Sequence, residues 1–404
     1  MRLVVVVGLI ALSACSSGTS SLPPPSGGGH EGEPRIKSAS SIKAYAVVTS
    51  FQSGNIHHPL ANVTFDSSGN IYGTGMDGTS PDVYGGIFKI DPHGNESDLY
   101  AFTGSNVTQP EADVVTVPGG GLIGTTIDGV YSLSSSGSEK VIKLLSGGPE
   151  GGYSFSNLIE DKQGNYWGTA SEGGYFLGKC KQIYVGCGVV FRVSASGRYS
   201  VVHKFRYIDG ASPAAGLALG PDGNFYGTTT FGGSIGWGEV FRITSAGKVT
   251  VLYNFQKGPD GDQPVAGVTL DSHGNIYGTT QYGGFAGNQT CNNGCGVVFK
   301  LSGTGQETVL HQFSSIPDGA FPLAAVYLEN DSTLFGTTQQ GGTGTGTIFE
   351  LNTSGKAYHV LHEFTDGPDG GFPAAALVPD NQGNLYGTTE YGGIGGGTVF
   401  RFRP

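Results

Sequence analysis

Positive charge is scarce in this sequence. The chain has 404 residues, with 21 Lys and Arg against 32 Asp and Glu, which gives a net charge of −11. A protein that binds nucleic acid needs a stripe of basic side chains to face the phosphates. The basic residues of this chain are scattered. The composition therefore argues against nucleic acid as a partner.

Helical periodicity and enzyme motifs are also missing. After residue 14, no stretch keeps the i, i+3, i+4 apolar spacing of an amphipathic helix. The sequence contains no nucleophile elbow, no P-loop and no dinucleotide-binding fingerprint. Tyr, Phe, Val and Thr, which favour strands, are frequent instead. We therefore expect an all-β protein, and we further expect a monomer with no cofactor and no metal ion.

The N-terminus has the form of a bacterial lipoprotein signal. Arg2 precedes an apolar run, residues 3–12, that is too short to span a bilayer. The run ends in Leu-Ser-Ala-Cys, which is typical of a lipobox with Cys15 as the lipidated residue. Ser16, rather than Asp, follows this cysteine, which predicts anchoring in the outer membrane, facing the periplasm or the cell surface. An ordinary signal peptide that contains a cysteine is the alternative.

These features divide the chain into three parts. Residues 1–14 are the expected signal peptide, and residues 15–42 are the expected lipidated cysteine with a tether rich in Ser, Gly and Pro. Residues 43–404 are the expected folded domain.

That domain is built from repeats. A Gly-Thr pair that ends an aromatic strand recurs seven times, with its glycine at Gly73, Gly124, Gly168, Gly227, Gly278, Gly336 and Gly387. Each unit holds four strand-like segments, here called A to D; in the fourth unit they are residues 214–219, 224–229, 238–243 and 249–255. Four antiparallel strands in about fifty residues are typical of a β-propeller blade. The sequence thus predicts a seven-bladed β-propeller.

The segment count predicts how the ring closes. Only six D segments follow the first repeat, because the chain stops after a C segment. The seventh D segment is residues 45–51, near the N-terminus, which matches residues 199–205 and 358–364. We expect this segment to pair with the C strand of the last blade, which would remove the open sheet edges.

The Gly-Thr motif itself is interpreted as structural. A glycine in the middle of a strand usually marks the close approach of another group. We expect an aromatic ring from the neighbouring C strand to cover it, such as Phe299, Phe349 or Phe400. A motif that occurs in nearly every blade is unsuited to a single active site.

At the level of these motifs the sequence resembles a known family. "YGTT..GG", followed by "G.VFK/R" and "VL..F", is similar to the tandem GloVer (Gloeobacter/Verrucomicrobia-type) repeat of bacterial exported proteins, over roughly residues 45–404. The first two blades depart from the pattern, because the first reads "GTGMDG" and the second lacks the tyrosine. The resemblance implies an exported repeat protein and assigns it no chemistry.

The loops suggest where a ligand would bind. B–C and D–A loops leave a blade on one face, and the B–C loops range from residues 127–129 to about eighteen residues in the third blade. Insertions that collect on one face usually mark the binding face. The candidate binding residues on this loop face are Tyr175, Phe231, Trp237, Tyr282, Tyr391, Asp209, Asp260, Asp318 and Asp369. Aromatic rings beside carboxylates suit sugars; alternatively, Asp-Gly is only turn chemistry and the aromatics pack against the loops.

Four cysteines remain after Cys15, two in each of two B–C loops. In an exported protein an even number predicts disulfides. We expect the local pairs Cys180–Cys187 and Cys291–Cys295, with a zinc site or free thiols as alternatives.

Two classes of function remain. The first is a lipid-anchored, non-catalytic binding or scaffold propeller for a glycan or a protein. The second is a propeller enzyme, a lyase or hydrolase, that uses the adjacent His57 and His58 with Glu111 as the nearby carboxylate. His203, His311 and His362 recur at one position of the D segment and are interpreted as packing residues.

Overall fold

The structure is a computed structural model that describes residues 44–52, 56–78, 80, 82–104, 107–182, 186–284 and 291–404. Lys43–Pro404 forms one compact unit. The expected signal peptide, Cys15 and the tether lie outside the described residues. Within the described part of the chain, no helix has the length and apolar character needed to cross a membrane.

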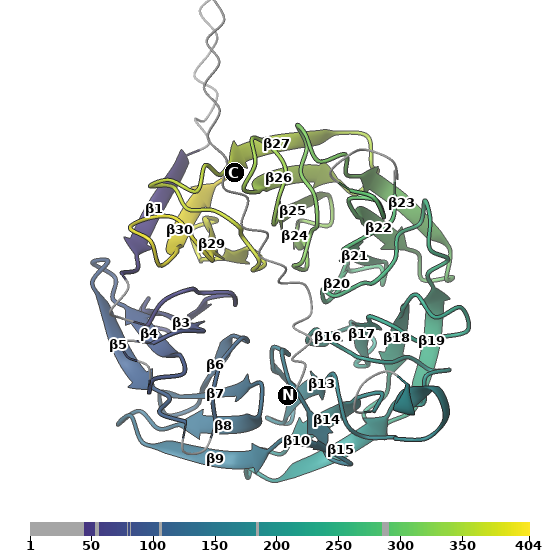
Figure 1. Ribbon diagram of the computed structural model, residues 1–404, viewed down its shortest axis with the longest axis horizontal. Helices are drawn as coiled ribbons and strands as arrows, with labels where there is room; N and C mark the ends of the chain where they lie inside the picture. Colours follow the sequence, from purple (N-terminus) through teal and green to yellow (C-terminus); the bar gives the residue numbers. More distant parts are fainter. Residues whose placement is uncertain are drawn as a thin grey trace, which may run out of the picture. The chain divides into compact units, whose positions relative to one another are not determined.

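Seven four-stranded antiparallel sheets form a ring, so the protein is a seven-bladed β-propeller, as predicted (Figure 1). The first three blades contain these strands, in the order A to D. Blade 1 has β2 (Thr64–Phe65), β3 (Ile71–Gly75), β4 (Gly86–Ile90) and β5 (Glu96–Ala101). Blade 2 has β6 (Val114–Val117), β7 (Gly121–Thr126), β8 (Gly129–Leu133) and β9 (Glu139–Leu144). Blade 3 has β12 (Ile159–Glu160), β13 (Tyr166–Ala170), β14 (Val189–Val193) and β15 (Tyr199–Lys204).

The remaining blades follow the same order. Blade 4 has β16 (Ala218–Leu219), β17 (Phe225–Thr229), β18 (Glu239–Ile243) and β19 (Val249–Asn254). Blade 5 has β20 (Thr269–Leu270), β21 (Ile276–Thr280), β22 (Val297–Leu301) and β23 (Glu307–Gln312). Blade 6 has β24 (Tyr327–Glu329), β25 (Thr333–Thr338), β26 (Thr347–Asn352) and β27 (Tyr358–Glu363). Blade 7 has β28 (Val378–Pro379), β29 (Leu385–Thr389), β30 (Thr398–Arg403) and β1 (Ala44–Ser50).

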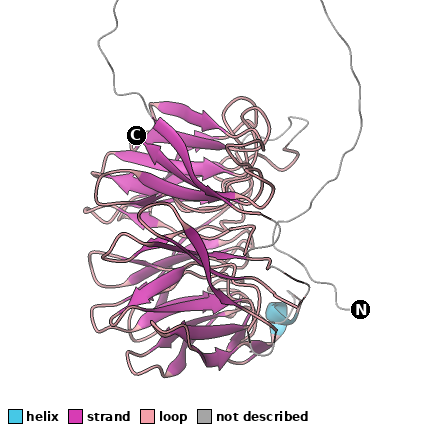
Figure 2. Cartoon of the chain, turned by 90° about the vertical axis from the view of Figure 1, so that its left-hand side faces the viewer, coloured by secondary structure: helices cyan, strands magenta, loops and turns pink. Residues whose placement is uncertain are grey.

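Among the described residues, two short strands and one helical turn lie outside the blades. β10 (Ser146–Gly148) and β11 (Gly151–Gly152) form a small hairpin in the loop from blade 2 to blade 3. The 3₁₀ turn η1 (Gly178–Lys181) belongs to the long B–C loop of blade 3 and is the helix in Figure 2.

The N-terminal strand closes the ring, as the segment count predicts. β1 is the outer strand of blade 7 and pairs antiparallel with β30, with Tyr45 opposite Phe402 and Val47 opposite Phe400. Phe51, at the end of this segment, is buried at 1% exposure. The outer strand of the last blade therefore comes from the beginning of the domain.

The mid-strand glycines make room for aromatic rings, which confirms the structural interpretation of the motif. A Cβ atom added to Gly278 would lie 2.6 Å from the ring of Phe299. At Gly387 the corresponding distance to the ring of Phe400 is 2.4 Å. Any larger residue would collide with a buried ring.

The threonine of the motif has a role that the sequence did not reveal. In every blade its hydroxyl donates a hydrogen bond to a backbone carbonyl that lies two or three residues before strand A of the next blade. The seven bonds run from Thr74 to Ala112, Thr125 to Ser156, Thr169 to Ala215, Thr228 to Ala266, Thr279 to Ala324, Thr337 to Ala375 and Thr388 to Ala61. The Gly-Thr pair thus joins sheets within and between blades.

These bonds also explain why the A strands are shorter than expected. In blade 4 the sequence predicts strand A over 214–219, but β16 contains only Ala218–Leu219. The carbonyl of Ala215 accepts a hydrogen bond from Thr169 of blade 3. The first part of this segment therefore contacts the neighbouring blade instead of extending the ladder of its own sheet.

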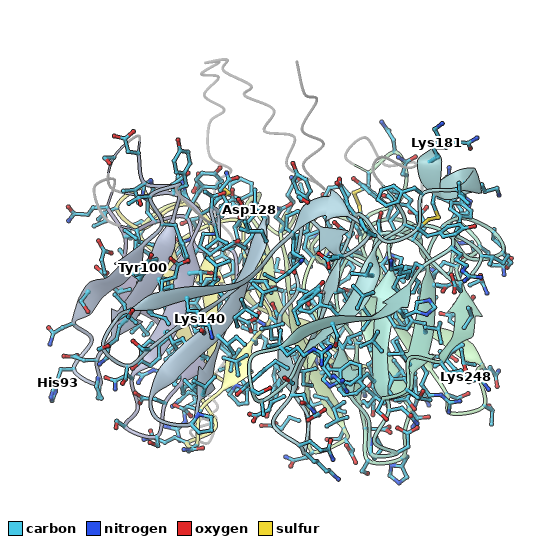
Figure 3. All side chains as sticks on the ribbon, turned by 90° about the horizontal axis from the view of Figure 1, so that it is seen from below. His93, Tyr100, Asp128, Lys140, Lys181 and Lys248 are labelled. Atoms are coloured by element: carbon cyan, nitrogen blue, oxygen red, sulfur yellow. A yellow bond between two sulfur atoms is a disulfide. The ribbon has the colours of Figure 1, made fainter. Side chains whose placement is uncertain are left out.

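The two faces of the ring differ in regularity. Figure 3 shows Asp128 and Lys181, from B–C loops, at one edge of the domain and His93 and Lys248, from C–D turns, at the other. On the turn face, the A–B turns repeat one arrangement in which an aspartate accepts hydrogen bonds from an asparagine four residues later. The pairs are Asp66–Asn70, Asp161–Asn165, Asp271–Asn275 and Asp380–Asn384.

Candidate functional site

The loop face repeats one backbone feature in every blade, and the side chains attached to it vary. Every D–A loop contains a non-glycine residue in the left-handed conformation, namely His58, Gln109, Tyr153, Ser212, Gln263, Phe321 and Phe372. Its carbonyl accepts a hydrogen bond from the backbone N–H of the second residue after the Gly-Thr pair, at the start of the B–C loop. The donors are Met76, Ile127, Ser171, Thr230, Gln281, Gln339 and Glu390. Each blade thus holds two side chains at equivalent places, and their chemistry differs from blade to blade.

The junction of blades 7 and 1 brings together ionisable side chains. His58 Nδ1 lies 2.8 Å from Asp77 Oδ2, and the rings of His57 and His58 are 4.6 Å apart. The ring of Tyr391 lies 5.0 Å from that of His58. The predicted histidine pair and the predicted binding residue Tyr391 therefore belong to one cluster. Asp77 was not foreseen.

Two further carboxyl groups lie in the electrostatic field of this cluster. Burial raises the pKa of Glu390 to about 6, the charge of Asp77 adds to the shift, and the Tyr391 hydroxyl opposes it. Glu390 is 1% exposed, and the Tyr391 hydroxyl lies beside its carboxyl group without the geometry of a hydrogen bond to either oxygen. Burial also raises the pKa of Glu111 to about 7, with a contribution from Glu390. Glu111 was predicted as the nearby carboxylate, whereas Glu390 was missed.

A second site is a pocket at the junction of blades 3 and 4. It has a volume of about 360 Å³ and lies between the B–C loop of blade 3 and the D–A loop that follows β15. Its lining residues are Tyr175, Leu177, Gly178, Lys179, Arg206, Tyr207, Ile208, Gly233 and Ser234. Tyr175 was a predicted binding residue; the two cations and Tyr207 were not.

Cations and aromatic rings are paired at this junction. Arg206 lies over the ring of Tyr175 at 5.5 Å, and Lys179 lies over the ring of Tyr207 at 4.7 Å. A similar pair, Lys257 over the ring of Trp237 at 4.0 Å, lies at the next junction, between blades 4 and 5. Cations held in this way stay near the rings without a carboxylate partner. The pocket is thus lined by positive charge in a protein whose net charge is −11.

A buried carboxyl group beneath the pocket does not cancel this charge. Glu239 is fully buried, and its Oε2 would lie 2.7 Å from a Cβ atom added to the pocket residue Gly233. Burial raises the pKa of Glu239 to about 9, and the charge of Asp209 adds to the shift. Glu239 is therefore protonated and neutral at pH 7.

The four predicted acids of the loop face have hydrogen-bond partners within the domain. Three of them pair with the repeated histidine of the D strand, as His203–Asp209 at 3.0 Å, His311–Asp318 at 2.9 Å and His362–Asp369 at 3.2 Å. Asp260 accepts a hydrogen bond from Tyr253 instead, at 2.8 Å. Burial is the largest influence on Asp209 and opposes ionisation, but the hydrogen bonds from His203 and from the backbone of Arg206, together with the charge of His203, outweigh it and lower the pKa of Asp209. These contacts give the acids a structural role.

The remaining predicted aromatics are partly buried in the loop face. Phe231 packs against the core cluster of blades 3 and 4, and Trp237 packs against that of blades 4 and 5. Tyr282 meets Phe321 edge to face at 5.7 Å. Tyr391, at 36% exposure, is the most open of them.

Both expected disulfides are present. Cys180–Cys187 closes the B–C loop of blade 3, and Cys291–Cys295 closes that of blade 5. Cys180 lies in η1, next to the pocket residue Lys179. The first disulfide therefore fixes one wall of the pocket to the blade core, in which both of its cysteines are buried.

The protein is thus a seven-bladed propeller whose loop face carries both candidate sites. Its family is shown by comparison of the sequence with known families. Residues 178–292 and 287–404 each match the Gloeobacter/Verrucomicrobia repeat. Since the two matches cover more than half of the chain, the protein belongs to this repeat family. No curated protein sequence matches the chain.

Solved structures share the fold at low sequence identity. Virginiamycin B lyase from Staphylococcus aureus is 14% identical, with a TM-score of 0.59 over 90% of this chain and 99% of that one. Puromycin hydrolase is 14% identical, with a TM-score of 0.52 over 83% of this chain and 50% of that one. An extracellular domain described as part of a two-component system from B. thetaiotaomicron is 11% identical, with a TM-score of 0.58, and this chain covers 39% of it. At these identities the likeness shows the shared fold alone.

Proposed function

We propose that this protein is a lipid-anchored binding propeller, displayed outside the cytoplasm, whose blade 3–4 pocket binds an acidic carbohydrate. The observation that carries this proposal is the pairing of Tyr175 and Tyr207 with Arg206 and Lys179 around one pocket. Tyrosine rings stack on the apolar faces of sugar rings. A guanidinium group binds a carboxylate through two parallel hydrogen bonds.

The positive charge of the pocket favours acidic sugars over neutral ones as the proposed ligand. The acids first expected to bind hydroxyl groups are engaged with His203, His311, His362 and Tyr253. The pocket instead presents Arg206 and Lys179, and the carboxyl group of Glu239 below it is neutral. A sugar that carries a carboxylate, such as a uronic acid, matches this arrangement better than a neutral one.

Exposed apolar side chains at the rim of the pocket would support binding of a polymer. The exposed side chains of Leu177 and Ile208, at 65% and 66% exposure, border the pocket on the loop face. A polymer could lie across this rim while one residue of it enters the pocket. The anchor and the outer-membrane location are part of the proposal.

The test is calorimetric titration with an oligogalacturonate and with its fully methyl-esterified form, which keeps the sugar rings and removes the charge. We expect binding of the charged oligomer only. Arg206→Ala should weaken it roughly 10–100-fold, the effect of losing a hydrogen bond to a charged group. The matched control is Arg198→Ala, an exposed arginine of the same blade in the C–D turn. Equal binding of both oligomers, or equal loss in both variants, would refute the proposal.

An enzyme is the second candidate function, and the cluster at blades 7 and 1 is the observation that favours it. Carboxyl groups with raised pKa values, such as Glu111 and Glu390, are typical of acid–base catalysts. In this case the protein would be a lyase or hydrolase. Turnover that is lost in His57→Ala, and kept in Arg206→Ala, would replace the binding proposal by this one.

A further inference from the structure

We propose that His57, His58 and Asp77 form a binding site for one divalent transition-metal ion of the zinc type, on the loop face where blade 7 meets blade 1. One ligand atom from each residue lies within 4.8 Å of the others. This inference is independent of the carbohydrate pocket, which lies at blades 3 and 4. It differs from the expectation of no metal that the sequence alone suggested.

The backbone brings the two adjacent histidines to the same side. In an extended segment, neighbouring side chains point in opposite directions. His58 has a φ of 54°, in the left-handed region, and this break in the alternation leaves the two imidazole rings 4.6 Å apart. A left-handed backbone at a residue other than glycine is often found at functional sites.

Backbone hydrogen bonds hold all three residues in place. His57 and Asp77 exchange two of them, of 3.1 and 3.3 Å, and His58 N donates to Gly396 O at 2.8 Å. The segment is thus attached both to the B–C loop of blade 1 and to that of blade 7. A site whose backbone is fixed before binding loses less entropy when the ion arrives.

The donor set selects the kind of metal. Two imidazole nitrogens and one carboxylate oxygen suit zinc and its neighbours, whereas magnesium and calcium prefer oxygen ligands. Ligand atoms around a tetrahedral zinc ion lie roughly 3.3 Å apart, given Zn–N distances of about 2.0–2.1 Å. The ligand atoms here lie up to 4.8 Å apart. Asp77, whose side chain is 48% exposed, has the freedom to rotate and adjust its distance to the ion. Three protein ligands leave a coordination position open.

A second observation at the same place also points to a cation. Glu390 is buried at 1% exposure, neither of its oxygens makes a hydrogen bond, and its charge interacts with that of Asp77. Two carboxylates that share a partly buried place repel each other, and a cation between them relieves the repulsion. Glu390, which lies outside the group of three, is therefore a candidate outer partner of the ion.

The molecule contains its own controls for this site. His203–Asp209, His311–Asp318 and His362–Asp369 are also histidine–aspartate pairs, with separations of 3.0, 2.9 and 3.2 Å. Over the residues that the structure describes, none of these pairs belongs to a group of three potential metal ligands. His311 and His362 stack on Tyr358 and Tyr45 at 3.8 and 3.9 Å, as packing residues do. An isolated histidine–aspartate pair is thus insufficient for the proposed site.

The experiment uses the full chain without a polyhistidine tag, made metal-free by chelation. Zn²⁺, Co²⁺ and Mg²⁺ are titrated separately, with bound metal per chain, the visible Co²⁺ absorption and the melting temperature as readouts. We expect one Zn²⁺ or Co²⁺ per chain and no response to Mg²⁺. His57→Ala and His58→Asn should each weaken binding more than about 100-fold, beyond the effect of losing an outer partner. Asparagine is chosen at His58 because it tolerates the left-handed backbone.

His362→Ala is the control for the loss of a histidine–aspartate pair, and His359→Ala, an exposed histidine, is the control for general folding. Both should bind Zn²⁺ as the unmodified chain does. Asp77→Asn should weaken binding while it keeps the fold, which guards against a variant that fails through misfolding. Absence of stoichiometric Zn²⁺ and Co²⁺, unchanged affinity in the His57 and His58 variants, or an equal loss in His362→Ala would overturn the proposal.

Discussion

Asp271 on the turn face and Glu239 on the loop face are both buried, yet their carboxyl groups behave in opposite ways. Burial opposes charge at Asp271, but hydrogen bonds from Asn275 and Tyr277 outweigh it and lower the pKa. At Glu239, burial raises the pKa to about 9, and neither oxygen has a hydrogen bond. Asp271 belongs to a turn that recurs around the ring. Glu239 occupies a position at which no other blade has a carboxyl group.

The same contrast extends over both faces. Turn-face aspartates that accept the repeated asparagine hydrogen bonds, such as Asp66 and Asp380, also have lowered pKa values although burial opposes the shift. Glu111 and Glu390 on the loop face have raised ones, mainly because of burial. A polar group that recurs with all its partners maintains the architecture. A buried polar group without partners is a departure from the repeat, and such departures are where function is expected.

Removal of the ring-closing strand should have the largest effect of any change. Deletion of residues 43–52 would leave blade 7 without β1 and expose the edge of β30. An unpaired strand edge promotes aggregation, and the buried side chain of Phe51 would be lost as well. We expect aggregation or loss of cooperative unfolding, measured by calorimetry and light scattering. A truncated protein that melts as the full chain does would contradict the closing role of β1.

A matched pair of glycine substitutions compares the repeated strands with the loop face. Gly387→Ala would place a Cβ atom 2.4 Å from the ring of Phe400. Overpacking of this kind costs about 1–3 kcal/mol. Gly148→Ala, in the loop hairpin, would have its nearest neighbour at 3.9 Å, and we expect a change within about 0.5 kcal/mol. Urea unfolding measures the free energy of unfolding of both variants. Equal losses would show that the space above Gly387 is not required for the Phe400 ring.

Loss of the Cys180–Cys187 disulfide should reduce both stability and ligand binding, because this disulfide borders the pocket. Replacing Cys180 and Cys187 by serine removes a bond between residues seven apart, and loop entropy predicts a loss of about 2 kcal/mol. Replacing Cys291 and Cys295, four residues apart, should cost a similar amount. Only the first pair borders the pocket, so only its loss should also weaken binding of the oligogalacturonate. Equal binding by both variants would separate the disulfide from the pocket.

The dependence of stability on pH should differ between carboxyl groups of the two faces. Glu239 has a raised folded pKa, so its cost is present above about pH 9 and is relieved as the pH falls toward its unfolded value of about 4.3. The turn aspartates have lowered pKa values, so their stabilisation is present above about pH 3.9 and is lost as the pH falls through the folded pKa.

We therefore expect the free energy of unfolding to rise from pH 8 to pH 5 and to fall below about pH 4. Glu239→Gln should flatten the upper part of this profile, because glutamine has no proton to release. Asp271→Asn should reduce the loss at low pH. Denaturant unfolding at several pH values provides the measurement, and an unchanged upper slope in Glu239→Gln would show that this carboxyl group ionises normally.

The repeated part of the molecule could be predicted from the sequence because the same residue types recur at similar intervals along the chain. The blade count, the closing strand and the rings over Gly278 and Gly387 follow from that pattern. Both disulfides were predicted separately, from two pairs of nearby cysteines in an expected exported protein. The length of the A strands did not follow, because Thr169 bonds to Ala215 across blades.

The sites were less accessible to prediction. Asp77 meets His58 only because a left-handed residue turns the chain, and no sequence pattern in one blade shows this. Glu390 could have been found by aligning the second residue after the Gly-Thr pair in each repeat, since it is the one acid among Met, Ile, Ser, Thr and Gln residues at that place. Arg206 and Lys179 lie in loops whose paths the repeat does not determine.

Hydrogen–deuterium exchange with and without a saturating oligogalacturonate would test most directly whether function lies in the departures from the repeat on the loop face. The account predicts slower exchange in residues 175–182 and 206–208, which line or border the pocket, and unchanged exchange in the turns at Asp271 and Asp380. Protection confined to the turn face, or spread evenly over all seven blades, would contradict it.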